Sequence, residues 1–221
     1  MSKHIVIYSH GFGVSKDDRG LFPDIASALP SCQHEMFDYN HFDEARGAIV
    51  VSPFNKQAIK LSQIVSQIKQ DNPEAIIDMV CHSQGCITAA ITCPEGIRRT
   101  IFLAPPDNLD IDRLITKFNR PGSTLDLEGE SLLVRRDGGL TIVPKEYWSS
   151  AKPLQVLSLY NRLGNKTDLT IIDATEDETL GNTDFTKTNE SIKLSQLSAD
   201  HNFTGDARDE VKKLVVDLLQ A

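Results

Sequence analysis

The stretch IIDMVCHSQGCITAA, residues 76–90, sets one serine, Ser83, between two mostly apolar runs. The run before it is short, as in a strand with both faces buried, and the run after it continues as a helix. Cys81 and Gly85, two positions before and after the serine, are both small. A sharp strand-to-helix turn needs small residues there, because strand and helix nearly touch. The stretch therefore predicts a serine nucleophile at the end of a central strand.

Strands and helices alternate outward from this turn, which indicates an α/β fold with a doubly wound, mainly parallel sheet flanked by helices. We expect one domain over residues 1–221. In the amphipathic segment 55–70, the buried face is expected to carry Ile59, Ile64, Val65 and Ile68. The strands are predicted at 4–10, 33–39, 75–81, 98–104, 169–174 and 191–197, and further helices at 19–30, 153–164 and 208–220.

Residues 107–151 lose this periodicity and are interpreted as an insertion over the carboxyl end of the strands, where ligands bind in such sheets. Within it, residues 131–144 predict a hairpin turning at Asp137, Gly138 and Gly139. Its apolar side chains, Tyr147 and Trp148 among them, offer a surface that can cover a substrate, and Arg135 and Arg136 offer positive charge.

A serine nucleophile needs a base, and an acid that orients the base. His201 lies in a loop between the last predicted strand and the last helix, so it opens on the same end of a parallel sheet as Ser83. The acid is expected after the strand 169–174, where Asp177 is preferred and Asp173 is the second candidate. The order along the chain is then Ser, Asp, His.

The segment SHGFGV, residues 9–14, follows the first strand and allows the backbone to turn an amide toward the serine. The N–H groups of Phe12 and Gln84 are the candidate oxyanion-hole donors, and loss of one such donor costs about 2.7–4 kcal/mol of transition-state stabilisation. His10 and His82, which flank these groups, are candidates for substrate contact, with Tyr147 and Trp148.

HGFGVSKDDRGLF, CHSQG, DATED and ADHNF together resemble the motifs of the α/β-hydrolase superfamily, in particular its single-domain serine esterases and lipases. The resemblance implies a triad of Ser83, Asp177 and His201, backbone oxyanion donors at Phe12 and Gln84, and a small lid at 107–151. MFDYNHFDEARG resembles the segment of that group in which a strand end meets a Gly-rich turn. Cysteine at position 81 departs from the usual glycine.

The composition of the chain limits the classes of partner that this protein is expected to bind. A formal net charge of −8 and a pI near 5.2 argue against nucleic-acid or anionic-membrane binding, and no apolar run approaches the ~20 residues of a membrane span. The four cysteines lack metal-ligand spacing and read as free thiols of a reducing compartment. We therefore expect a cytoplasmic monomer or homodimer that acts on a small-molecule ester without a metal or cofactor.

Two alternatives remain open. A thioester or amide bond would use the same residues, and an aminopeptidase could use acids around 107–112 to bind a substrate amine. A non-catalytic binding protein of the same fold is the other alternative.

Overall fold

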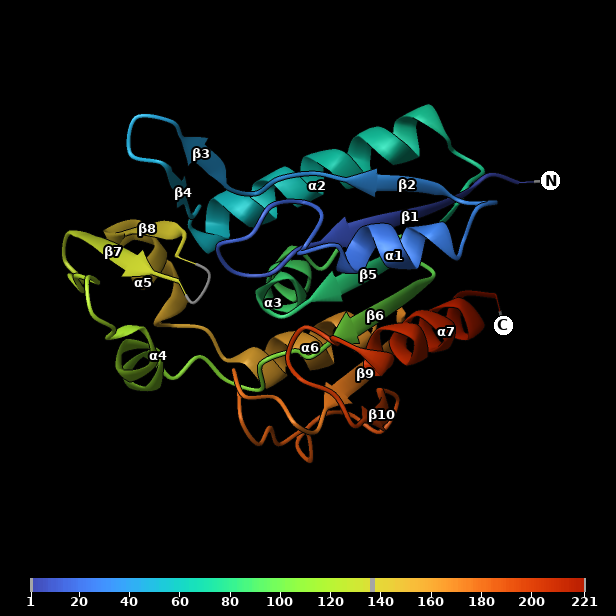
Figure 1. Cartoon of the computed structure of the whole chain (residues 1–221). Helices are drawn as coiled ribbons and strands as arrows, with labels where there is room; N and C mark the ends of the chain where they lie inside the picture. The colour runs from blue at the N-terminus through green and yellow to red at the C-terminus, as the bar shows by residue number, and fades with distance from the viewer. Residues whose placement is uncertain (1, 136–137, 221) are drawn as a thin grey trace.

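The computed structural model describes residues 2–135 and 138–220, so Arg136 and Asp137, at the expected hairpin tip, lie outside the described residues. The larger of its two sheets has six strands, in the order β10-β9-β6-β5-β1-β2, and every neighbouring pair is parallel. This arrangement confirms the predicted fold class (Figure 1). The strands are β1 His4–Ser9, β2 Gln33–Met36, β5 Ile76–His82, β6 Arg99–Leu103, β9 Asp168–Ala174 and β10 Lys193–Leu197.

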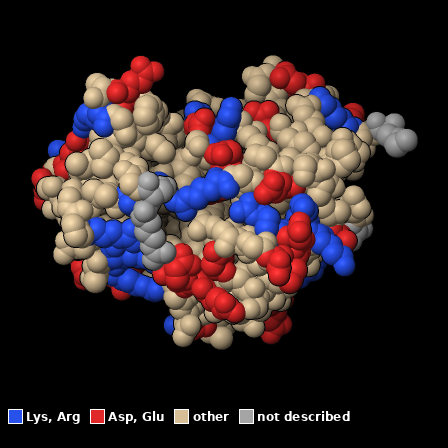
Figure 2. All heavy atoms as spheres, viewed as in Figure 1, with Lys and Arg blue, Asp and Glu red and all other residues tan. Residues whose placement is uncertain are grey.

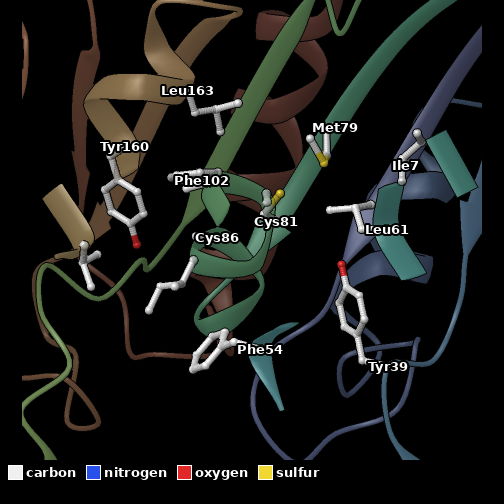
Figure 3. Packing of buried hydrophobic residues seen from close by; sticks show 14 of the residues in the cluster. Ile7, Tyr39, Phe54, Leu61, Met79, Cys81, Cys86, Phe102, Tyr160 and Leu163 are labelled. Carbon is white, nitrogen blue, oxygen red and sulfur yellow. The ribbon is translucent and has the colours of Figure 1, made fainter. Parts of the chain in front are cut away.

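Helices cover both faces of this sheet, because alternate residues of its strands point to opposite sides and both sets are apolar. In β1, Ile5 and Ile7 join one buried cluster and Val6 and Tyr8 the other. The first cluster packs under α2, α3 and α6, and Figure 3 shows its central part. The second packs under α1 and α7. The helices are α1 Leu21–Ser27, α2 Phe54–Asp71, α3 Gln84–Thr92, α6 Val156–Gly164 and α7 Asp206–Gln220.

The buried face of α2 differs from the one predicted. Leu61, Val65 and Ile68 are buried, whereas Ile59 is 58% exposed. Ile59 precedes Leu61 by two residues, which on an α-helix is about 200° around the axis, so the two cannot share a face. The expectation for Ile59 was therefore wrong.

A second, four-stranded sheet, in the order β3-β4-β8-β7, lies beside the first (Figure 1). β7 Glu130–Val134 and β8 Leu140–Pro144 form the predicted antiparallel hairpin. β3 His41–Asp43 and β4 Ala48–Val50 complete the sheet from a distant part of the chain, since β4 pairs in parallel with β8. The segment MFDYNHFDEARG, residues 36–47, thus contains β3 and the turn that leads to β4, so the second sheet extends beyond residues 107–151. Residues 107–151 also contain two helices that the sequence analysis does not predict, α4 Ile111–Phe118 and α5 Lys145–Ala151.

The cysteines are free in the described structure. Cys81 and Cys86 are fully buried next to Phe102 and Met79 (Figure 3), while Cys32 and Cys93 are only partly buried. Cys81 is an ordinary member of the β5 ladder, opposite Ser9 of β1. A cysteine at this position therefore fits the strand, and the space-limited position is Gly85, where an added Cβ would lie 2.0 Å from the Ser9 carbonyl oxygen.

Candidate active site

Ser83 lies on the turn between β5, in the middle of the large sheet, and α3. Its backbone is left-handed, with φ 51° and ψ −125°, a conformation that L-residues rarely adopt and that marks strained functional turns. The Ser83 N–H donates to the Leu103 carbonyl at the end of β6 (2.9 Å), which ties the turn to the neighbouring strand. The α3 N-terminus directly follows the serine, so its positive end faces the site.

His201 and Asp177 reach Ser83 from the loops after β10 and β9. The Ser83 hydroxyl lies 2.9 Å from His201 Nε2, and His201 Nδ1 lies 2.6 Å from Asp177 Oδ2. All three residues are buried, and each follows the carboxyl end of a strand of the same parallel sheet. The structure thus brings together a hydroxyl, an imidazole and a carboxylate whose positions are separated by as many as 118 residues.

Both carboxylate oxygens of Asp177 accept hydrogen bonds. Its second oxygen accepts the N–H groups of Thr179 (2.7 Å) and Leu180 (2.6 Å). Burial opposes ionisation, but the hydrogen bond and charge of His201 outweigh it, and the pKa of Asp177 lies below its usual value. Asp173, the second candidate, instead accepts a hydrogen bond from the Thr183 hydroxyl (2.7 Å) and has no contact with His201 among the described residues.

The surroundings of His201 favour the neutral form of its imidazole. Burial lowers its pKa below the usual value, and the nearby His82 adds to the effect, while the hydrogen bond to Asp177 opposes it. A neutral imidazole whose Nδ1–H is held by a carboxylate leaves Nε2 as a proton acceptor toward Ser83.

The backbone N–H groups of Phe12 and Gln84 form no hydrogen bond with an acceptor in the described part of the chain. The Gln84 amide is the first of α3. Phe12 follows Gly11, whose own N–H is bound to the Asp18 carboxylate (2.9 Å). The Phe12 ring stacks on Phe118 of α4 and contacts Tyr147 of α5, which holds this loop against these two helices.

A cavity of about 470 Å³ opens over Ser83, in the range of small-molecule sites. It lies between the strand ends of the large sheet and the part of the chain that contains α4. Much of its wall is apolar, with Phe12, Leu114, Phe118, Leu133 and Tyr147 among the lining residues.

The four candidates for substrate contact have different positions. Tyr147 lines the cavity and donates to the Gln84 side-chain oxygen (2.7 Å). His82 also borders it, but both ring nitrogens contact protein oxygens, Asp18 Oδ2 and the His201 carbonyl. His10 and Trp148 are buried away from the lining, where His10 accepts the Tyr39 N–H and the Trp148 indole donates to Ser131.

Cations border the cavity although the chain as a whole is acidic. Arg19, Arg113 and Arg120 line it and form no ion pair with a described residue, whereas Arg46, Arg98, Arg99 and Arg208, elsewhere in the molecule, each pair with a carboxylate. Figure 2 shows Lys and Arg atoms gathered over the region where Figure 1 places α4. Of the acids that the aminopeptidase alternative would use, Asp107 and Asp110 also line the cavity: Asp110 caps α4 by accepting the Arg113 N–H (3.0 Å), and Asp107 accepts the Asp184 N–H (2.9 Å).

Within the described ranges, no cluster of three or more His, Cys, Asp or Glu side chains has the geometry to hold a metal ion. No helix there combines the length and apolarity that crossing a bilayer requires. Sequence reasoning missed Asp18, the buried partner of His82, because a loop acid carries no periodic signal; its position between a Gly-rich turn and a helix is the only hint.

Comparison with protein-family models and with curated proteins gives no match. Solved structures are similar over almost the whole chain. Est1E from Butyrivibrio proteoclasticus, in a structure with ferulic acid bound, has a TM-score of 0.71 at 16% identity, covering 100% of this chain and 91% of that one. A Pyrococcus furiosus esterase has a TM-score of 0.66 at 19% identity, covering 99% and 81%.

An α/β serine hydrolase homologue from Coxiella burnetii has a TM-score of 0.63 at 13% identity, covering 99% of this chain and 86% of that one. At these identities the likeness concerns the fold. The chain therefore has the α/β-hydrolase fold, and its structural relatives include esterases.

Proposed function

We propose that this protein is a serine hydrolase that cleaves small-to-medium carboxylic esters through an acyl-enzyme on Ser83. The observation that carries the proposal is the buried hydrogen-bond chain from Ser83 Oγ through His201 to Asp177, with lengths of 2.9 and 2.6 Å, at the floor of a cavity. A strained serine with a base and an oriented acid is the arrangement that acyl transfer requires.

In the proposed mechanism, His201 Nε2 takes the Ser83 proton as the serine oxygen attacks the ester carbonyl. Asp177 keeps Nδ1 protonated and stabilises the imidazolium that forms. The N–H groups of Phe12 and Gln84, which lack acceptors within the described chain, bind the oxyanion of the tetrahedral intermediate. His201 then protonates the leaving alcohol, and water releases the acyl group by the same steps in reverse.

We further propose that α4 and the second sheet serve as a lid over the substrate. Support comes from α4, which has half-buried apolar residues at Leu114 and Phe118 on the cavity wall and no fully buried residue. Such a helix covers a site without being part of a core. The apolar wall suits an acyl or aromatic group, and Est1E, with ferulic acid bound, makes aromatic acyl esters a sensible part of a substrate panel.

The aminopeptidase alternative is less well supported, because Asp107 and Asp110 each already accept a backbone N–H and arginine side chains line the same cavity. A thioester uses the same chemistry and belongs in the same panel. The cytoplasmic location, the monomeric or dimeric state and the single-domain organisation remain expectations from the sequence.

The test compares the wild type with Ser83→Ala. The wild type should hydrolyse p-nitrophenyl esters and form one fluorophosphonate adduct on Ser83, and the variant should fold normally and lose both properties. Hydrolysis of aminoacyl anilides in preference to esters would redirect the proposal to an amidase. A wild type that neither turns over any ester or thioester nor reacts with the probe would support the non-catalytic alternative.

A further inference from the structure

A second histidine–aspartate pair, His82 and Asp18, contacts the proposed triad through the carbonyl oxygen of His201. His82 Nδ1 lies 2.8 Å from Asp18 Oδ2, and the side chains are only 3% and 1% exposed. A charged pair so deeply buried is costly to desolvate unless its hydrogen bonds are complete. The mechanism proposed above uses neither side chain, so the position of this pair needs its own explanation.

The pair connects three loops of the site. The Asp18 oxygen that accepts from His82 also accepts the Gly11 N–H (2.9 Å), in the loop that carries the Phe12 amide. His82 precedes Ser83 on the turn, and its Nε2 donates to the carbonyl oxygen of His201 (2.9 Å). One carboxylate therefore links the Phe12 loop, the serine turn and the histidine loop.

The pKa values of His82 and Asp18 are both shifted in the direction that favours an ion pair. Burial disfavours an imidazolium, but the charge and hydrogen bond of Asp18 outweigh it and raise the pKa of His82 above its usual value. Burial likewise opposes the Asp18 carboxylate, and His82 outweighs it, so the pKa of Asp18 is lowered. A cationic His82 donates from both ring nitrogens, as its two oxygen partners require.

The backbone that carries Asp18 is strained. Asp18, Arg19 and Gly20 have φ angles of 46°, 57° and 83°, three left-handed residues in succession of which only one is glycine. Left-handed conformations are unfavourable for L-residues with a side chain, and such strain persists where the surroundings impose it, often at functional sites. Here it turns a loop acid inward to the floor of the site.

We infer that Asp18, acting with His82, is a positioning residue that orients the oxyanion-hole loop relative to Ser83. Because Asp18 accepts the Gly11 N–H, the following peptide is turned so that the Phe12 N–H is left for the substrate oxyanion. This inference rests on the proposed function, since it concerns the oxyanion hole of that reaction.

The experiment compares Asp18→Asn with Asp17→Asn, the same change at the exposed neighbouring residue. For each we would measure kcat and KM for a p-nitrophenyl ester and the affinity for phenylboronic acid, which forms a tetrahedral adduct with the serine. Misplacing an oxyanion donor acts on the transition state, so Asp18→Asn should lower kcat about 10- to 100-fold and weaken the boronate to a similar extent. KM should change less than threefold, and Asp17→Asn should behave as the wild type.

A folded Asp18→Asn variant with kcat and boronate affinity within threefold of the wild type would overturn the inference. An increase in KM alone would do so too, since it would indicate a role in ground-state binding. If the variant does not fold, NMR of the wild-type amides decides: a Gly11 N–H that is protected from hydrogen exchange supports its hydrogen bond to Asp18, and a Gly11 N–H that exchanges freely refutes it. Failure of the proposed function would instead appear in the wild type, as absence of ester turnover.

Discussion

Replacing Gly85 with alanine tests how closely the serine turn is packed. A Cβ at this position would lie 2.0 Å from the Ser9 carbonyl oxygen, 2.5 Å from the Ser9 carbonyl carbon and 2.7 Å from the His10 carbonyl oxygen. Contacts below 3.0 Å are not tolerated, so α3 and the end of β1 must separate by about 1 Å. The added Cβ is fixed to the backbone of α3, and the atoms it would meet are backbone atoms of Ser9 and His10. No rotamer change can therefore relieve the contact.

This displacement affects folding and activity together. Overpacking of a buried contact costs about 1–3 kcal/mol, and we expect the upper end because a strand end and a helix start must move. Ser83 lies on one side of the contact and the Phe12 loop on the other, so their separation would misalign the proposed nucleophile and the proposed oxyanion donor. A misplacement of about 1 Å lowers activity on the order of 100-fold.

The assay combines urea denaturation with kcat/KM for a p-nitrophenyl ester. Gly164→Ala in α6 is the matched control, because its Cβ would meet only side-chain atoms, Ile192 Cγ1 at 2.8 Å and Leu169 Cδ2 at 3.8 Å, and Gly164 does not line the cavity. It should retain activity within twofold. A Gly85→Ala variant with less than 1 kcal/mol of lost stability and kcat/KM within threefold of the wild type would refute the packing argument.

Four further predictions concern single residues. Asp177→Asn should lower kcat about 10⁴-fold, by allowing the wrong imidazole tautomer, and Asp173→Asn far less; stopped-flow or steady-state ester hydrolysis that ranks them in reverse would transfer the acid role. The proposed mechanism needs a neutral His201, and burial lowers the pKa of His201, so the acid limb of kcat/KM should have its midpoint below pH 6.5; a midpoint above 6.5 would contradict this. Thr141→Val should raise the free energy of unfolding by about 1 kcal/mol in urea, since the Thr141 hydroxyl is buried without a partner in the described structure; a loss of stability would reveal one. Arg113→Gln should raise KM for a carboxylate-bearing ester but not for its neutral analogue, and equal effects on both would argue against an anionic substrate.

The position of the acid shows how far sequence reasoning reaches. Both Asp173 and Asp177 follow from the strand 169–174, but a pattern of residues does not say how the chain turns after it. In the structure Asp173 is still in the β9 ladder, opposite Gln196 of β10, whereas Asp177 lies on the turn beyond, where its carboxylate meets His201. Distance beyond the strand end, rather than residue type, separates the two.

The second sheet shows where sequence reasoning stops. β3 and β4 have three residues each, and β4 pairs with β8, about 90 residues later in the chain. Strands this short have no periodic signal of their own and are stable only when paired. Their pairing depends on the position of the rest of the chain, so the sequence pattern predicts no hairpin at 41–50.

The local pattern of this sequence determined the alternating strands and helices, the parallel sheet buried on both faces, and the small residues that a serine turn requires. Those features depend on periods of two and 3.6 residues and on steric limits within a few positions, which are visible in a linear chain. Only the tertiary structure decided that Asp177 rather than Asp173 meets His201, that Asp18 lies under His82, and that Thr141 is left without a partner. Each of these depends on where loops from different strands converge, and convergence is set by the packing of the whole sheet.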